Sequence, residues 1–251
     1  MATVEARQRS LLLPTIAAGL AFIILCALGT WQVERLQWKE ALIARVEAGL
    51  SADPVPAPGP TAWPGLDVGA VEYRPVEVRG TFDHDREIHV VYTLVEPKGP
   101  KGGIGFQVFT PLRTDDGWWV YVNRGFVPRE NADAATRSEA QVSGETTVTG
   151  LLRQPGHRSW FMPSDDPAGN AWFSRDPALF AAASGLPAGE VAPYVIDAAF
   201  DPSLPGGLPQ GGETIVSFAN SHLQYAITWY GLAVALVAVY VAFVIKRRRN
   251  S

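Results

Sequence analysis

The 251-residue sequence contains a single cysteine, Cys26, and four histidines. With one thiol the chain forms no intramolecular disulfide, and it has neither the C-x-x-C spacing of copper and redox sites nor the C-x-x-C-H attachment site of haem. The G-x-S-x-G and H-E-x-x-H patterns of hydrolases and zinc proteases are also missing. These absences leave catalysis without support in the sequence, and we expect a protein that is not an enzyme.

Basic residues are scarce between the two ends of the chain. Residues 32–224 contain 15 Lys and Arg against 24 Asp and Glu, a net charge of −9. Nucleic-acid binding requires clustered Lys and Arg, so no nucleic-acid partner is expected. Charge is absent altogether from residues 11–28 and 227–245. Each of these apolar runs is long enough to cross a hydrocarbon core of about 30 Å at about 1.5 Å per residue.

The first apolar run has two interpretations. Arg7 and Arg9 precede it, as in a cleaved signal peptide, but a helical pattern continues beyond it to about residue 48. A retained anchor is therefore favoured, with a transmembrane helix over residues 11–31. The second transmembrane helix is predicted over residues 225–245.

Basic residues also predict the orientation of the chain. Arg7 and Arg9 lie before the first span, and Lys246 to Arg249 follow the second. By the positive-inside rule, residues 1–10 and 246–251 are both cytoplasmic. Ten residues are too few for a mitochondrial presequence. We therefore expect a multi-pass protein of the bacterial inner membrane, in contact with lipid, with its large loop in the periplasm.

The loop itself divides into two parts. Residues 51–70 contain five prolines and no periodicity, which predicts a stiff connector outside the core. Residues 71–221 form the predicted periplasmic β-rich domain. Apolar residues alternate over 76–82, 88–94, 104–108 and 118–122, and further strands are expected at 145–152, 192–199 and 213–218.

Local signals in this region predict turns and one helix. Asp116-Gly117 predicts a hairpin turn between two strands. Asp176 as N-cap and Gly185 as terminator predict a helix over residues 177–183. The predicted fold class is a membrane protein with two transmembrane helices flanking a mainly β domain, an antiparallel barrel or sandwich with minor α+β character.

Two stretches resemble binding motifs without meeting their requirements. The glycines of residues 99–105 suggest a phosphate loop, but a strand follows where a helix should begin, so a hairpin loop is favoured. His84 and His89 suggest a metal site. On a strand, residues five apart point to opposite faces, so a polar hairpin is favoured over shared metal ligation.

Aromatic and polar residues gather at the outer ends of both apolar runs. Helical spacing places His222, Tyr225 and Trp229 on one face of the second helix. Trp31, Arg35, Trp38 and Leu42 share a face of the first helix in the same way. A neutral imidazole can ligate iron and a guanidinium can pair with a carboxylate. The alternative is an interfacial aromatic belt with a snorkelling arginine, and spacing alone favours the belt.

The chain resembles the surfeit-locus-protein-1 family of cytochrome c oxidase assembly factors over nearly its whole length. Single motifs are weak, but their order between two spans is specific. The segments that carry the resemblance are Gly29-Thr30-Trp31-Gln32 with Arg35 and Lys39, Leu42-Ile43, Tyr73-Arg74-Pro75-Val76, Gly80-Thr81-Phe82, Gly105-Phe106, Thr110-Pro111-Leu112, Val122-Asn123-Arg124-Gly125-Phe126-Val127-Pro128, Trp172 with Arg175-Asp176, and His222-Leu223-Gln224-Tyr225 with Thr228-Trp229-Tyr230-Gly231-Leu232.

The resemblance implies a non-enzymatic factor that assists delivery of haem a to the catalytic subunit of the haem–copper oxidase, with haem a synthase as a further partner. It implies that His222 is the axial ligand of the haem iron, which reverses the preference for the belt. Trp31, Arg35, Tyr225 and Trp229 would complete the cofactor site.

Two other functions remain to be weighed. A haem-independent scaffold that holds oxidase subunits is the main alternative, and haem content separates the two. An anchored sensor is disfavoured, because the six residues 246–251 leave no room for an output domain.

Overall fold

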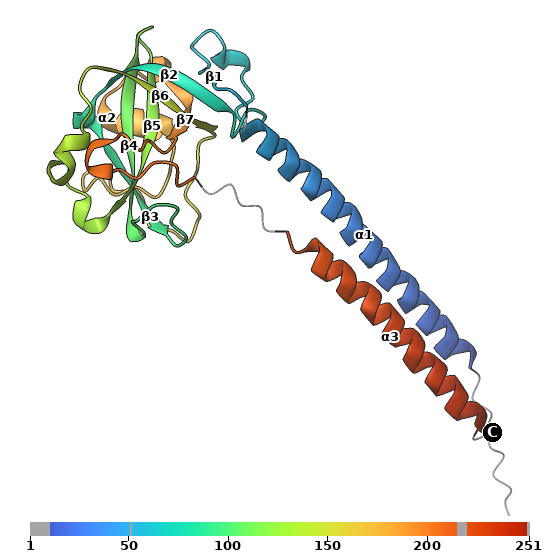
Figure 1. Cartoon of the computed structure of the whole chain (residues 1–251). Coiled ribbons are helices and arrows are strands. Elements are labelled where there is room, and N and C mark those ends of the chain that lie inside the picture. The colour runs from blue at the N-terminus through green and yellow to red at the C-terminus, as the bar shows by residue number, and fades with distance from the viewer. Residues whose placement is uncertain (1–10, 51, 215–219, 250–251) are drawn as a thin grey trace, which may run out of the picture. The chain divides into compact units, whose positions relative to one another are not determined.

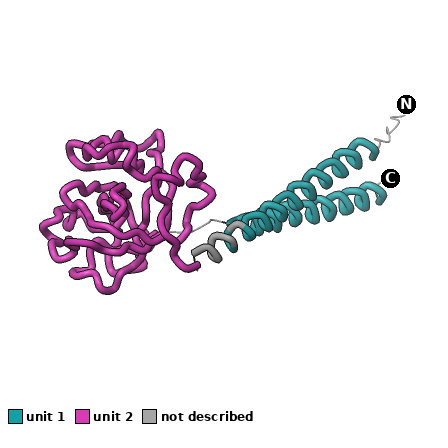
Figure 2. The backbone as a smooth tube through the Cα atoms, turned by 90° about the horizontal axis from the view of Figure 1, so that it is seen from above, with its two compact units in different colours: residues 1–45, 217–251 teal, residues 46–216 magenta. Residues whose placement is uncertain are grey.

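The computed structural model describes residues 11–50, 52–214 and 220–249, with the backbone alone at residues 42 and 45–50. The chain divides into two compact units, which are distinguished in Figure 2. Residues 1–45 and 217–251 form a helical unit, and residues 46–216 form a β unit.

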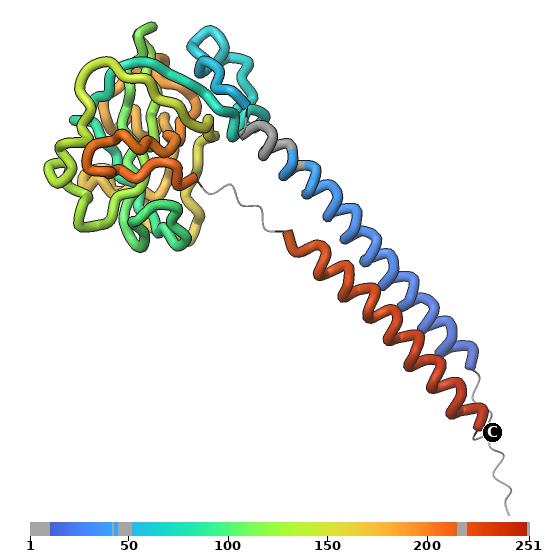
Figure 3. Tube along the Cα trace, viewed as in Figure 1, coloured from blue at the N-terminus to red at the C-terminus, as the bar shows by residue number. Residues whose placement is uncertain are grey.

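The helical unit is an antiparallel pair of long helices. Helix α1 (Leu12–Leu50) and helix α3 (His222–Arg249) run side by side, as Figures 1 and 3 show. Residues 12–41 and 222–249 are long and apolar enough to cross a membrane. Helix α1 continues unbroken past its apolar run, as the sequence pattern predicted.

Small residues allow the two helices to approach each other closely. Ala226 and Ala233 are buried on α3, and on α1 a Cβ added to Gly29 would lie 2.9 Å from the ring of Tyr230. Close packing of this kind drives helix association in lipid, where the hydrophobic effect between helices is absent. Two hydroxyl pairs also join the helices: Thr30 with Tyr230 at 3.0 Å and Thr15 with Tyr240 at 2.5 Å.

The β unit contains a closed barrel, which confirms the predicted fold class. Its strands are β1 (Val55–Pro56), β2 (Pro75–Phe82), β3 (Ile88–Leu94), β4 (Gly103–Thr114), β5 (Trp119–Pro128), β6 (Glu145–Arg153) and β7 (Val191–Ala198). They pair in the order β1-β2-β6-β7-β5-β4-β3, and an additional β2–β4 pairing closes five of them into a ring. The sheet is mixed, because β1 with β2 and β5 with β7 are parallel.

Short 3₁₀ segments connect these strands. They are η1 (Trp63–Gly65), η2 (His84–Arg86), η3 (Arg129–Asn131), η4 (Ala134–Ala140), η5 (Ala188–Glu190) and η6 (Pro205–Gly207). The predicted hairpin turn between β4 and β5 is confirmed: Gly117 has φ +89°, and the Thr114 amide donates to the Trp118 carbonyl at 2.8 Å.

Helix α2 (Pro177–Ser184) covers the outer face of the barrel. The Asp176 carboxylate accepts the Ala178 amide, and Gly185 ends the helix with φ +68°, as predicted. Phe180 of α2 packs against Phe109 and Tyr121, while alternate residues of the same strands face the barrel interior. Strand β5 is consequently buried on both of its faces.

The proline-rich stretch differs from the connector that we expected. Strand β1 pairs with β2, and Trp63 contacts the ring of Trp118 edge to face at 5.7 Å. The Tyr194 hydroxyl and the Trp63 indole both donate to the Pro58 carbonyl, at 2.7 and 2.8 Å. Proline suits an edge strand whose outer side makes no ladder, so this stretch packs against the barrel core.

The strand expected at 213–218 is not found where the structure describes it. Glu213 and Thr214 lie outside the strands, and the remaining residues of that range lie outside the described residues. The buried Glu213 carboxylate instead accepts the backbone amides of Lys98 and Gly99, at 2.9 and 2.8 Å.

Candidate functional site

The imidazole of His222 contacts the first helix at the start of α3. Its Nδ1 lies 2.7 Å from Oε1 of Gln32, a residue 190 positions earlier in the sequence. Gln32 is only 9% exposed on α1, and His222 is half-buried. The antiparallel pairing of α1 and α3 therefore brings the histidine against a buried amide.

This contact selects one tautomer of the imidazole. A carboxamide oxygen only accepts hydrogen bonds, so Nδ1 carries the proton and donates it to Gln32. The other ring nitrogen, Nε2, is then the lone-pair nitrogen, and no residue in the described ranges is hydrogen-bonded to it. A neutral imidazole held through Nδ1–H, with Nε2 open, has the arrangement of a metal-ligating histidine.

The aromatic residues near this end of the two helices are largely exposed. Trp31 and Trp38 of α1 are each about half exposed, at 51% and 50%, and the Arg35 guanidinium lies 4.5 Å from the centre of the Trp38 ring. Counting about 100° per residue from the Gln32–His222 contact places Trp31 and Tyr225 on the same flank of the antiparallel pair.

On α3, the three residues that were predicted to share one face are spread more widely around the helix: His222, Tyr225 and Trp229. The side that faces α1 passes through His222 and the buried Ala226, whereas Tyr225 is 53% exposed and Trp229 is partly buried. His222 and Trp229 therefore lie nearer the helix contact, with Tyr225 on the flank. The side chain of Leu42 lies outside the described residues.

Sequence reasoning overlooked the partner of the histidine. Gln32 was noted within the Gly29-Thr30-Trp31-Gln32 segment but was given no role. The available signal was a neutral amide at the outer end of an apolar run, where an unpartnered polar group is costly. Its partner lies in the other helix and could be found only from their pairing.

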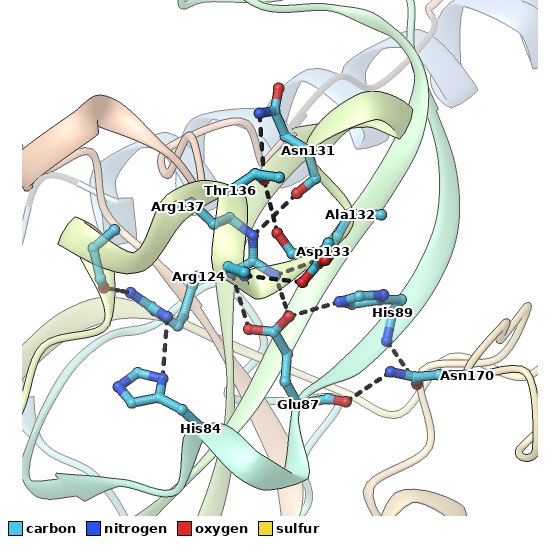
Figure 4. A network of polar contacts seen from close by, with 12 residues as sticks. His84, Glu87, His89, Arg124, Asn131, Ala132, Asp133, Thr136, Arg137 and Asn170 are labelled. Atoms are coloured by element: carbon cyan, nitrogen blue, oxygen red, sulfur yellow. Dashed lines mark hydrogen bonds and ion pairs between the residues drawn. The ribbon is translucent and has the colours of Figure 1, made fainter.

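Two of the histidines of the β unit, His84 and His89, have separate partners, and Figure 4 shows the contact of His89 with Glu87. His89 Nε2 lies 2.6 Å from the Glu87 carboxylate, and His84 Nε2 lies 2.9 Å from the Val142 carbonyl. Within the described ranges, no group of three His, Cys, Asp or Glu is placed to hold a metal. The imidazoles serve the packing of this region.

Glu87 is the buried acid of that network. Its carboxylate also receives the Arg137 guanidinium, with Nη1 at 3.0 Å, and its side chain is only 6% exposed. Burial by itself raises the pKa of Glu87, but the hydrogen bonds from His89 and Arg137 outweigh it and hold the pKa below its ordinary value of 4.5. Glu87 is thus an ionised structural residue.

The chain combines a β-barrel unit with two helices that are long and apolar enough to cross a membrane, and the Gln32–His222 contact joins these two helices. These features are typical of the class of membrane-anchored proteins that carry a folded unit outside the lipid. A family model described as "SURF1 family" matches residues 19–234. The chain belongs to the SURF1 family, whose members are known as cytochrome oxidase assembly factors and are generally non-enzymatic.

Individual relatives match most of the chain. Surfeit locus protein 1 of Homo sapiens is 41% identical over 236 residues, which cover 90% of this chain and 73% of the relative. The protein of the same name from Mus musculus is 40% identical, covering 90% and 71%. A SURF1-like protein of Monosiga brevicollis is 38% identical, covering 87% and 83%. Membership implies interaction with cytochrome oxidase assembly intermediates.

Proposed function

We propose that this protein assists delivery of haem a to the catalytic subunit of the haem–copper cytochrome c oxidase, and that His222 is the axial ligand of the haem iron. The observation that carries the proposal is the Gln32–His222 hydrogen bond of 2.7 Å, which leaves Nε2 available to iron. The same bond fixes the orientation of the ring before any ligand arrives, so less entropy is lost on binding.

The side chains around His222 suit an amphiphilic porphyrin. Trp31, Tyr225 and Trp229 supply flat apolar walls, and Arg35 supplies a cation for a propionate at the membrane surface. When bound, haem a would contribute its iron and its apolar tail. Gln32 is a neutral second partner for the imidazole, and a neutral partner makes the ligand less basic than a carboxylate would. A carrier that releases its cargo benefits from that weaker ligand.

The location forms part of the proposal. With basic residues at both ends of the chain, we place both termini in the cytoplasm and the β unit in the periplasm of a bacterium, within reach of haem a synthase. A phosphatase fused near Gly59 is expected to be active, and one fused after Arg249 inactive. The opposite result overturns the orientation.

The site is tested by replacing the ligand. Full-length protein purified from cells that make haem a is expected to show a Soret band, and His222→Ala is expected to lose it while the protein still inserts and folds. Oxidase activity in the cells then falls towards that of a deletion strain. His157→Ala is the matched control, because the His157 side chain is 80% exposed on the β unit. Unchanged haem content in His222→Ala refutes the ligand assignment.

One observation favours a haem-independent scaffold as the second candidate. Trp160 and Phe161 of the β unit are 91% and 71% exposed and contact each other edge to face. Exposed aromatic pairs of this size are typical of surfaces that contact other proteins. Wild-type protein free of haem, with oxidase assembly lost in a Trp160→Ser, Phe161→Ser variant, would support the scaffold.

A further inference from the structure

A cavity of about 190 Å³ lies in the β unit. Its walls come from β2, β5, β6 and β7 and from the loop of residues 199–211. Most of the lining is apolar, and one buried basic residue belongs to it. The lining residues that matter here are Phe82, Val122, Val148, Ala198, Leu204 and Arg124.

Arg124 is the buried cation, and no carboxylate of the described residues forms an ion pair with it. It is 7% exposed, and among the described residues no carboxylate lies within 4 Å of it. Its Nη2 donates to the Ala140 carbonyl. Its Nη1 lies 3.4 Å from His84 Nδ1, and Figure 4 shows this contact. The guanidinium also lies 5.2 Å from the centre of the Phe82 ring. Every one of these partners is neutral or aromatic.

The imidazole of His84, beside Arg124, is neutral and does not balance the charge of the guanidinium. His84 Nε2 donates to the Val142 carbonyl, so Nδ1 is the acceptor for Arg124. Burial lowers the pKa of His84 and keeps the ring neutral at pH 7. Burial likewise lowers the pKa of Arg124 to about 10, which still leaves the guanidinium charged.

The nearby carboxylates are engaged elsewhere. Glu87 is bound by Arg137 and His89, as described above. Asp201 lines the cavity, but its Oδ1 accepts the backbone amide and the hydroxyl of Ser203, at 2.8 and 2.6 Å. An uncompensated buried charge is costly, and an incoming anion removes that cost.

We propose that this cavity binds a small carboxylic acid, with the carboxylate on Arg124 and an apolar body against the side chains of β2, β5 and β7. A planar guanidinium matches a carboxylate through two parallel N–H bonds, and Arg124 Nε has no partner among the described residues. The apolar lining selects a carboxylate that carries a hydrocarbon group over an inorganic anion.

The volume limits the size of the ligand. An engineered protein cavity of about 150 Å³ holds one benzene molecule, so about one ring with its carboxylate fits here. The threonines of β6 at the rim, Thr146, Thr147 and Thr149, offer further hydroxyl donors. Ligands much larger than a substituted benzoate do not fit within these walls.

The experiment compares a charged probe with its neutral isostere. Full-length protein in lipid nanodiscs is titrated with 4-fluorobenzoate and with 4-fluorobenzamide, and binding is followed by fluorine NMR line width. Saturable binding of the benzoate is expected, with the amide weaker by roughly tenfold to a hundredfold, since hydrogen bonds to charged groups are the strong ones. Absent benzoate binding, or equal affinity for the two probes, overturns the proposal.

Variants locate the bound probe. Arg124→Gln is expected to remove the preference for the carboxylate. Should that variant fail to fold, Ala198→Leu decides, because it fills the cavity while keeping the arginine, and it is expected to weaken benzoate at least tenfold. Ala182→Leu on the exposed side of α2 is the matched control. Undiminished binding in Ala198→Leu places the probe elsewhere and overturns the assignment.

Discussion

In the β unit and in the helical unit alike, a glycine lies close to a neighbouring element. The two glycines differ in the atoms that they would meet if they carried a side chain. A Cβ added to Gly125 of β5 would lie 2.1 Å from the Gln210 carbonyl oxygen, and Gly125 has φ +127°. A Cβ added to Gly29 of α1 would lie 2.9 Å from the ring of Tyr230. The Gln210 backbone in the barrel cannot move aside, whereas the Tyr230 side chain in the helical unit can rotate away.

The polar side chains of the β unit have more hydrogen-bond partners than those of the helical unit. In the barrel, Asp197 is 3% exposed and accepts from Asn123 and from Arg153, both at 2.9 Å. In the helical unit, single side-chain pairs such as Gln32 with His222 and Thr30 with Tyr230 join the two helices. The polar groups of the barrel are therefore linked through a shared carboxylate, whereas the two helices are joined by separate side-chain pairs.

The largest effect is expected from Gly125→Glu. A side chain at positive φ costs about 1–3 kcal/mol, and a buried unpaired carboxylate and a backbone clash add to it. The sum approaches the whole stability of a domain, about 5–15 kcal/mol, so the barrel should lose protease resistance and its thermal transition. Gly117→Glu shares the positive φ but meets open space, and it should lose only about 1–2 kcal/mol. Equal melting temperatures in the two variants would contradict the close approach.

The second effect is expected from Glu87→Gln, which leaves Arg137 buried without its acid. Removal of one partner of a buried ion pair costs about 3–5 kcal/mol. The pKa of Glu87 is lowered in the fold, so the stabilisation is present above the unfolded pKa near 4.5 and is lost as the pH falls through the lower folded value. Denaturant unfolding of the wild type between pH 7 and pH 3 should therefore steepen below pH 4.5, and the variant should be flatter there. A variant with the wild-type slope would show that another carboxylate is responsible.

The third effect is expected from Gly29→Ala in the helical unit. Its new methyl group must displace the Tyr230 ring, for a loss of about 1 kcal/mol in helix association. Gly19→Ala is the control, because nothing lies within 4 Å of that position. Alanine there should be neutral or slightly favourable. Steric-trap measurements in bicelles report the difference, and identical values for both variants would argue against the close helix contact.

The fourth effect concerns Gln32→Leu, which removes the acceptor for His222 Nδ1–H. Loss of such a partner typically lowers metal affinity about 10–100-fold, while a neutral bond in a membrane contributes only about 0.6 kcal/mol to the fold. Haem affinity should therefore fall with little change in melting temperature. Gln32→Glu should instead strengthen the ligand and lower the reduction potential of the bound haem. Haem affinity that is indifferent to both changes would exclude Gln32 as the positioning residue.

The smallest effect is expected from Arg35→Ala. A propionate partner near water is screened, and exposed ion pairs contribute about 0.2–1 kcal/mol. Haem occupancy should fall by about fivefold at most, and Arg35→Lys should recover part of it. A loss of haem as complete as that in His222→Ala would contradict this minor role and would make Arg35 essential for binding of the porphyrin.

Much of the barrel could be predicted from the sequence because its signals are local. Alternating apolar residues predicted β2 and β3, the Asp116-Gly117 turn predicted the β4–β5 hairpin, and two caps predicted α2. The parallel pairing of β5 with β7 and the closure of β2 on β4 left no such signal. Those pairings join segments far apart in the chain, and local periodicity cannot encode them.

The site was predictable in part for the same reason. Helical periodicity aligned His222 with Tyr225 and Trp229, but it could not say which side of α3 would face α1. Burial of Ala226 and Ala233 settles that side, since small residues permit the close approach. Arg124 was quoted only as part of a strand motif. Its position as the extra residue of a bulge, opposite Val108 and Phe109, turns it away from the regular alternation.

The position of β7 in the ring sets the order in which the barrel can form. It is the last strand along the chain, yet it lies between β6 and β5. During synthesis, which proceeds from the N-terminus, the edges of β5 and β6 that pair with β7 therefore stay unpaired until residues 191–198 are available. Unpaired strand edges template aggregation. Chains that end before Val191 should accordingly aggregate or be degraded, while chains that end after Ala198 should already contain a protease-resistant barrel.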